Sequence, residues 1–344
     1  MIQQKDLERI DSKKMFKVYD EWPKIAKKSY FSNLSEINFK NCSNIVFAGM
    51  GGSGALGDIF SAILSKTKIH VTVVKGYYLP KTVDSNSLVI IISISGNTIE
   101  TLSVLNDARK IGAKIIGFSN GGKVKDLCIK NNLEYREIPK YHSPRASFTS
   151  FLYSMLQVLK PILPIAESDV LESIKQLEKL SSQINSKNVS INNPSLIISE
   201  WLKKSPIIYF PSGLESVAIR FKNSLQENTK MQAMIEDVIE SSHNGIVGWD
   251  KKSEFQPILL RGQDDQKTTK ERWEILKEFF DSKKIEYKEI ESECGNILTK
   301  IICLIYLLDY SSIYLAIKLG VDPDPVNAID FVKMKLREYG QNFE

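Results

Sequence analysis

The sequence predicts an α/β protein with two doubly wound domains, each a parallel sheet flanked by helices. Three observations support this fold class. Short apolar runs alternate with helical patterns, most runs lack the polar alternation of a half-exposed strand, and the strand, turn and helix that open the series recur in the second half. The 344 residues are enough for two cores, and we place the domains at residues 1–160 and 161–344.

The first half begins with about 40 charged residues of helical spacing. The strands expected after it are 45–48, 70–75, 88–93, 114–118 and 135–139. An apolar, helix-like segment over residues 148–163 follows them. Parallel strands are covered by helices on both faces, so near-continuous apolar runs of this length are what a parallel sheet requires.

The second half repeats this order after a polar stretch, residues 165–200, in which we expect an exposed helix with loops. Strands are expected at 206–210, 256–261 and 286–290, and a helix at 214–226. The turn after the first of these strands, Pro211-Ser-Gly213, has fewer glycines than its counterpart in the first half. We therefore expect one phosphate site per chain, in the first domain.

Composition and charge exclude several classes of protein. The net charge of +5 arises from 46 basic and 41 acidic residues that are interleaved, which indicates a solvated surface and no nucleic-acid partner. The charged N-terminus does not resemble a signal peptide, and Asp309 and Lys318 interrupt the apolar stretch 301–319, which predicts a buried helix and no membrane partner. Four cysteines without metal-like spacing indicate reduced thiols and a cytoplasmic location.

Two turns carry the chemistry of the first half. Gly49-Met-Gly-Gly-Ser-Gly54 follows the first strand, and Ser93-Ile-Ser-Gly-Asn-Thr98 follows the third. Glycines let the backbone approach an anion, hydroxyls donate hydrogen bonds, and the following helix presents unpaired N–H groups. Neither turn has the lysine of a nucleotide-triphosphate loop, so the pattern favours a phosphomonoester.

Other interpretations of these glycines remain open from the residues alone. Gly49-x-Gly51-x-x-Gly54 also matches a dinucleotide fingerprint, but Lys75 stands where that fold needs an acidic residue for the ribose. The near-match of Gly51-Gly-Ser-Gly-Ala55 to a nucleophile elbow lacks its last glycine. Each turn taken singly is also compatible with a role in packing alone.

The two turns in this order resemble the sugar isomerase (SIS) domain. Further motifs resemble those of the bifunctional phosphoglucose/phosphomannose isomerases, which carry two such domains. These matches are Pro144-Arg145, Gln226-Glu227-Asn228, Ser242-His243-Asn244 with Gly248-Trp249, and Asp322-Pro-Asp-Pro325 ahead of Lys333.

The resemblance implies an aldose–ketose isomerase that interconverts glucose 6-phosphate and mannose 6-phosphate with fructose 6-phosphate through an enediolate. The hexose 6-phosphates are its substrate partners, and no metal or organic cofactor is expected. The implied phosphate-binding residues are Gly52, Ser53, Ser93, Ser95 and Thr98, and the implied catalytic residues are Arg145, Glu227, His243 and Lys333. Lys335 is the alternative to Lys333. The resemblance also implies a homodimer in which His243 reaches the neighbouring subunit's site.

Glu227 has a physical rationale as the base that moves a proton between C2 and C1. Apolar residues between Leu214 and Leu225 form one stripe, so we expect the helix to pack along it and to end near Glu227. Two rivals remain: a sensor that binds sugar phosphates without turnover and has no use for Glu227, and an amino-sugar phosphate isomerase. Three histidines without ligand spacing argue against a zinc-dependent mechanism.

Overall fold

The computed structural model describes residues 2–39 and 42–339, which form two compact units. The β1–β5 unit comprises Glu21–Ala166 with Pro325–Glu344, and the β6–β9 unit comprises Met1–Asp20 with Glu167–Asp324. This division differs from the predicted one at both ends of the chain. The N-terminal helices α1 (Gln4–Ile10) and α2 (Met15–Asp20) pack against α13 (Ile297–Lys318), because they bury Leu7 and Met15 there.

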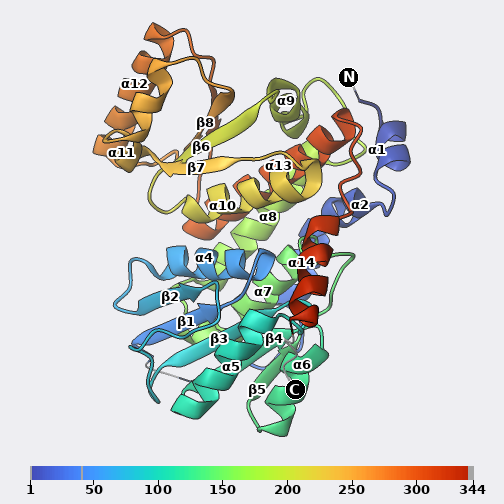
Figure 1. Cartoon of the computed structure of the whole chain (residues 1–344), viewed down its shortest axis with the longest axis vertical. Coiled ribbons are helices and arrows are strands. Elements are labelled where there is room, and N and C mark those ends of the chain that lie inside the picture. Colours follow the sequence, from blue (N-terminus) through green and yellow to red (C-terminus); the bar gives the residue numbers. More distant parts are fainter. Residues whose placement is uncertain (1, 40–41, 340–344) are drawn as a thin grey trace. The chain divides into compact units, whose positions relative to one another are not determined.

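The β1–β5 unit contains a five-stranded parallel sheet in the order β2-β1-β3-β4-β5, and all five strands were predicted (Figure 1). Its strands are β1 (Asn44–Ala48), β2 (His70–Val74), β3 (Leu88–Ser93), β4 (Lys114–Ser119) and β5 (Glu134–Glu137). Its helices are α3 (Trp22–Tyr30), α4 (Gly52–Leu64), α5 (Ile99–Ile111), α6 (Gly122–Lys130), α7 (Phe148–Val158) and α14 (Asn327–Glu338), with the 3-10 turn η1 (Lys160–Ile162). The chain leaves β1 and β3 in opposite directions, so the carboxyl ends of these two neighbouring strands form the switch point where such sheets bind ligands.

The β6–β9 unit repeats the first four positions of that order as β7-β6-β8-β9, again all parallel. Its strands are β6 (Ser205–Phe210), β7 (Met234–Asp237), β8 (Phe255–Arg261) and β9 (Lys288–Glu291). Its remaining helices are α8 (Glu167–Ile184), α9 (Pro194–Trp201), α10 (Glu215–Ser224), α11 (Val238–Ser241) and α12 (Lys267–Ser282), with the short turns η2 (Leu225–Thr229) and η3 (Gly245–Asp250). β7, a four-residue edge strand in which two residues are acidic and none is fully buried, was not predicted.

α13 is the core of the β6–β9 unit. In the described part of the chain it is the one helix long and apolar enough to cross a membrane, and 89% of its most apolar stretch is buried inside the protein. It packs against α8, α9 and α10, so the prediction of a buried helix is confirmed. The expectation of an exposed helix between 165 and 200 was wrong, because α8 buries Val170, Ile174 and Leu177 on its side facing α13.

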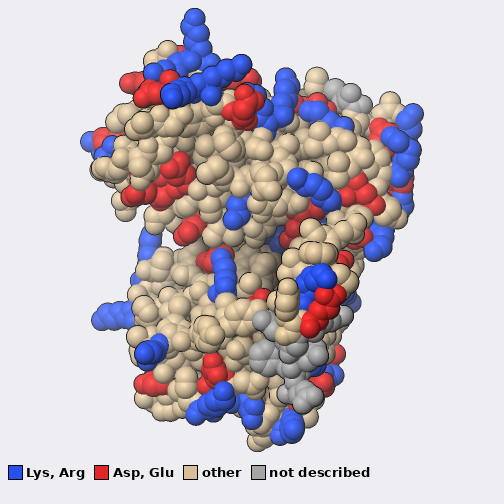
Figure 2. Space-filling view, viewed as in Figure 1, with Lys and Arg blue, Asp and Glu red and all other residues tan. Residues whose placement is uncertain are grey.

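Charged side chains of both signs are interspersed over the face drawn in Figure 2, including the part that carries α12. All four cysteines are free thiols. Within residues 2–39 and 42–339, no group of three or more histidine, cysteine or carboxylate side chains could hold a metal ion.

Candidate functional site

The turn after β1 brings backbone close to the carboxyl end of β3. Gly51, at φ +53°, precedes α4, and Gly52 and Ser53 form the first residues of that helix. A Cβ on Gly49 would lie 3.0 Å from the carbonyl oxygen of Ile92, so only glycine fits this approach. The Ser53 hydroxyl accepts a hydrogen bond from the Ile94 amide at 3.4 Å, which ties the two turns together.

The turn after β3 supplies three hydroxyls. The Ser93 and Thr98 hydroxyl oxygens lie 3.0 Å apart and share a hydrogen bond, while the exposed Ser95 hydroxyl accepts one from the Asn97 amide at 3.3 Å. Gly96 adopts φ +71°, and a Cβ there would lie 1.8 Å from the carbonyl oxygen of Gly121. Thr98 precedes α5, and its hydroxyl does not cap the helix.

This edge of the sheet can hold an anion without any cation. No side chain of the described residues caps α4 or α5. Apart from the Ser53 amide, which donates to the Met50 carbonyl oxygen at 3.0 Å, the first N–H groups of two neighbouring helices are therefore available to a ligand. β1 pairs with β3, which brings the two helix starts to the same edge of the sheet. The structure thus gathers Gly52, Ser53, Ser93, Ser95 and Thr98 at the switch point.

The other two candidates of the β1–β5 unit lie outside these turns. Arg145 lies in the segment between β5 and α7 and is buried, with 4% of its surface exposed. Lys333 lies on α14 with an exposed side chain whose nearest carboxylate, Asp330, is 3.9 Å away. Lys335 forms a closer ion pair with Glu338 at 2.6 Å, so Lys333 is the more available of the two amines.

Glu227 lies in η2, a π-helical turn that continues α10. π-Helical turns are rare and occur frequently at functional sites. The Asn228 amide donates to the Ser312 hydroxyl on α13 at 2.8 Å, and the Lys230 ammonium donates to the Glu227 carbonyl oxygen at 2.7 Å. These contacts fix the backbone on both sides of the Glu227 carboxylate, which is half-buried.

A buried ion pair supports this turn. The Arg220 guanidinium on α10 donates to the Asp309 carboxylate on α13 at 2.6 Å, and neither side chain exposes more than 2% of its surface. Ser224 also donates to Asp309, at 2.6 Å. Burial opposes the charge of Arg220, but Asp309 outweighs it and raises the guanidinium pKa, with a smaller contribution from Glu227. Sequence reasoning missed Arg220, although a lone aspartate in an apolar helix signals that a partner is needed.

His243 is exposed and follows α11, at the carboxyl end of β7. Asp237 accepts hydrogen bonds from the Ile239 and Glu240 amides and so fixes the start of α11. The Glu236 carboxylate packs on Gly245, where a Cβ would lie 1.9 Å from its oxygen. Burial raises the pKa of Glu236.

Glu227 and His243 lie at opposite ends of the same strand. Glu227 precedes β7 and His243 follows it, so the strand separates them within the β6–β9 unit. The structure therefore does not bring these two residues to one edge of their sheet.

Comparison with known families defines the class of protein. Residues 38–151, which contain both turns, match the SIS domain family. Residues 191–336, which contain Glu227, His243 and Lys333, match the family described as the bacterial phospho-glucose isomerase C-terminal SIS domain. The chain is thus an enzyme built from two SIS domains.

Comparison with whole proteins narrows the class to a family. A bifunctional phosphoglucose/phosphomannose isomerase from Caldicellulosiruptor bescii is 35% identical over 339 residues, covering 94% of this chain and 99% of the relative. One from Aquifex aeolicus is 29% identical over 327 residues, covering 93% and 95%. The chain belongs to the bifunctional phosphoglucose/phosphomannose isomerase family.

A solved structure supports the fold. The crystal structure of a hypothetical protein from Thermus thermophilus superposes with a TM-score of 0.73 and 12% identity, covering 97% of this chain and 92% of that one.

Proposed function

We propose that this protein interconverts glucose 6-phosphate and mannose 6-phosphate with fructose 6-phosphate in the cytoplasm, through an enediolate. The observation that carries the proposal is the pair of uncapped helix starts at the β1–β3 switch point, in a chain that belongs to this isomerase family. The turns would bind the phosphate through Gly52, Ser53, Ser93, Ser95 and Thr98. The free energy of binding the phosphate, which is remote from the reaction, then positions the reacting carbons C1 and C2.

Glu227 is the base in this proposal. It would move the proton between C2 and C1, while Arg145 and Lys333 would stabilise charge on the enediolate oxygens. The π-helical turn and its contacts to α13 support this role, because a base must be held in one geometry to act in the transition state. The reaction needs no redox step and no cofactor.

The first test replaces Glu227 with glutamine, which has the same shape and cannot accept the proton. We expect Glu227→Gln to lower kcat by roughly 10²–10⁴-fold for both aldose phosphates while sugar-phosphate affinity is kept. Formation of fructose 6-phosphate, followed by a coupled assay with a chelator present, measures the change. Glu215→Gln, on the exposed start of the same helix, is the matched control.

Full activity of Glu227→Gln would remove it as the base. Turnover of glucosamine 6-phosphate with no turnover of the neutral sugars would instead favour the amino-sugar alternative. Loss of activity on adding the chelator would contradict a cofactor-free mechanism.

His243 would open the sugar ring in the active site of the second subunit of a homodimer. Its position at the opposite end of β7 from Glu227 supports action across subunits. We expect inactive Glu227→Gln and His243→Ala proteins to regain about a quarter of wild-type activity when their subunits are mixed and exchanged, because each mixed dimer then has one complete site. Mixtures that stay inactive after exchange is verified would place both residues in the same subunit's site.

A further inference from the structure

Lysine pairs that are distant in the sequence meet at the amino edge of the second sheet. Lys203-Lys204 precedes β6, Lys251-Lys252 precedes β8, and Lys283-Lys284 follows α12. Five of these six residues line one pocket of about 420 Å³. A pocket of this volume is within the range of roughly 300–1,000 Å³ that small-molecule sites occupy.

The pocket has more positive than negative charge. Its two acidic residues are engaged, because Asp250 pairs with Lys283 at 2.9 Å and Glu286 accepts a hydrogen bond from the Trp201 indole at 2.8 Å. Across residues 2–39 and 42–339, neither Lys204 nor Lys252 forms an ion pair. Two amines without a counter-charge on one pocket repel each other and favour an anion between them.

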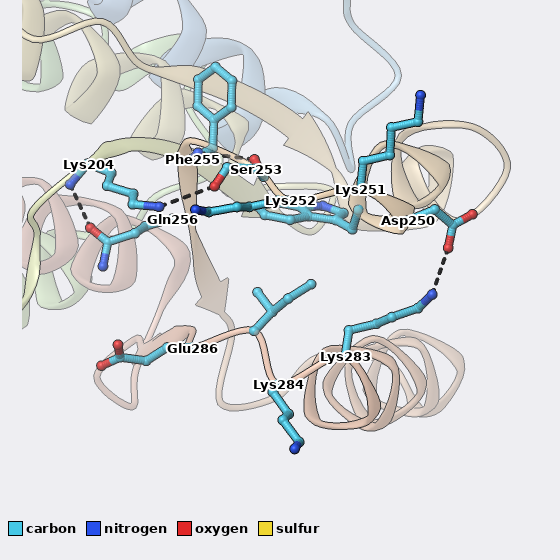
Figure 3. A pocket seen from close by; sticks show the side chains of 12 residues that line it. Lys204, Asp250, Lys251, Lys252, Ser253, Phe255, Gln256, Lys283, Lys284 and Glu286 are labelled. Carbon is cyan, nitrogen blue, oxygen red and sulfur yellow. Dashed lines mark hydrogen bonds and ion pairs between the residues drawn. The ribbon is translucent and has the colours of Figure 1, made fainter.

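The close view separates lysines that point into the pocket from those that do not. In Figure 3 the side chains of Lys204 and Lys252 point toward each other, whereas those of Lys251 and Lys284 point away from the pocket. The Lys204 ammonium donates to the Ser253 carbonyl oxygen at 3.2 Å, which holds it at this end. Lys204 and Lys252 are therefore the pair that an anion would meet.

The remaining wall suits the body of a small molecule. Trp249, Phe255 and Ile285 supply apolar surface, and the Trp249 ring is held by a 2.8 Å hydrogen bond from its indole to the Tyr209 hydroxyl. The side-chain oxygen of Gln256 accepts from the amides of Lys203 and Lys204, at 2.7 Å each. Its amide N–H groups remain as donors beside the two ammonium groups.

We propose that this pocket is a second anion site, which binds a small phosphorylated molecule with its phosphoryl group between Lys204 and Lys252. It differs from the switch-point turns in position and in chemistry. It lies at the amino edge of the second sheet and attracts its ligand by charge, whereas the turns lie at the carboxyl edge of the first sheet and use uncharged donors.

Tripolyphosphate is the probe, titrated calorimetrically into the full-length protein at low salt. Ser95→Ala/Thr98→Ala is used as the background, because it weakens the switch-point site. We expect Lys204→Gln/Lys252→Gln to raise the Kd of the remaining site by about tenfold or more, since two charge-assisted hydrogen bonds are lost. Lys251→Gln, the neighbouring lysine that points away, should change the Kd less than about threefold.

Three outcomes decide the proposal. Selective weakening by the Lys204→Gln/Lys252→Gln change supports it, with isomerase activity retained when the same change is made in the otherwise wild-type chain as the check on folding. Equal weakening by Lys251→Gln would indicate a diffuse basic surface and overturn it. Unchanged binding in Lys204→Gln/Lys252→Gln, or no binding in the Ser95→Ala/Thr98→Ala background, would also overturn it.

Discussion

The two sheets share a strand order, yet the turns at their switch points differ in chemistry. After β1 and β3 the chain places glycines and hydroxyls, and both following helices begin without a side-chain cap. After β8 it places Asp264 and Asp265, and Asp265 accepts hydrogen bonds from the Gly262 amide at 3.1 Å and from the Trp273 indole at 2.9 Å. The second switch point thus carries two carboxylates, one of them paired with Lys300, where the first carries uncharged hydrogen-bond donors.

The comparison shows that topology fixes where a site can be and the turn residues decide what it binds. In the β6–β9 unit, the turn that carries Glu227, the carboxylate that we propose as the base, is instead supported by a buried ion pair between α10 and α13. One unit depends on backbone geometry and the other on buried charge. Different substitutions should therefore disable each unit.

The largest effect is expected at the buried pair. Asp309→Asn leaves the Arg220 guanidinium buried without a counter-charge, which costs about 3–5 kcal/mol. We expect a large loss of unfolding free energy in the β6–β9 unit, measured by urea denaturation, and a fall in kcat as the Glu227 turn shifts. Phosphate affinity of the β1–β5 unit should not change, and an equal loss of affinity would contradict the independence of the two units.

A smaller effect distinguishes the glycines of the two switch points. Gly96→Ala places a Cβ 1.8 Å from a backbone oxygen at φ +71°, whereas Gly213→Ala, at φ +96°, meets no atom within 4 Å. Both substitutions should lower the free energy of unfolding by roughly 1–2 kcal/mol because of the positive φ. Only Gly96→Ala should lower it by about a further 1–3 kcal/mol, because of the overlap, and only this variant should lose phosphate binding. Urea denaturation and calorimetry measure the two quantities. Equal losses of unfolding free energy in the two variants would mean that the Gly96 turn can relax.

Much of the fold could be predicted because its signal is local. Eight of the nine strands in the described residues overlap predicted strands, six of them over apolar runs, and the two turns of the first unit are recognisable because their glycines and hydroxyls are contiguous. The short β7 lacks such a run. From the sequence we predicted only that Asp309 interrupts an apolar stretch. Its ion pair with Arg220 was not predicted, because the two residues are 89 positions apart.

The remaining features depend on contacts that no short segment reveals. The N-terminal helices join the β6–β9 unit through contacts with α13, which is nearly 300 residues later. The basic residues were interpreted as part of a solvated surface because they are interleaved with acidic ones in the sequence, and only the sheet brings these lysine pairs to one edge. The π-helical form of the turn at Glu227 was likewise not predicted, since its sequence continues the helical pattern of α10.

The smallest expected effect is a difference in pH dependence between one aspartate from each unit. Burial on α4 raises the pKa of Asp58 in spite of its ion pair with Lys75, so its stabilising contribution is present below the ordinary pKa and is lost as pH rises through the folded value. A hydrogen bond from Lys300 lowers the pKa of Asp264, so its contribution is present above the ordinary pKa and is lost as pH falls. Between about pH 3 and 6, the Tm of wild type minus that of Asp58→Asn should fall as pH rises. The Tm of wild type minus that of Asp264→Asn should rise over the same range. Slopes of the same sign would contradict the opposite directions in which the pKa values of these two aspartates are shifted.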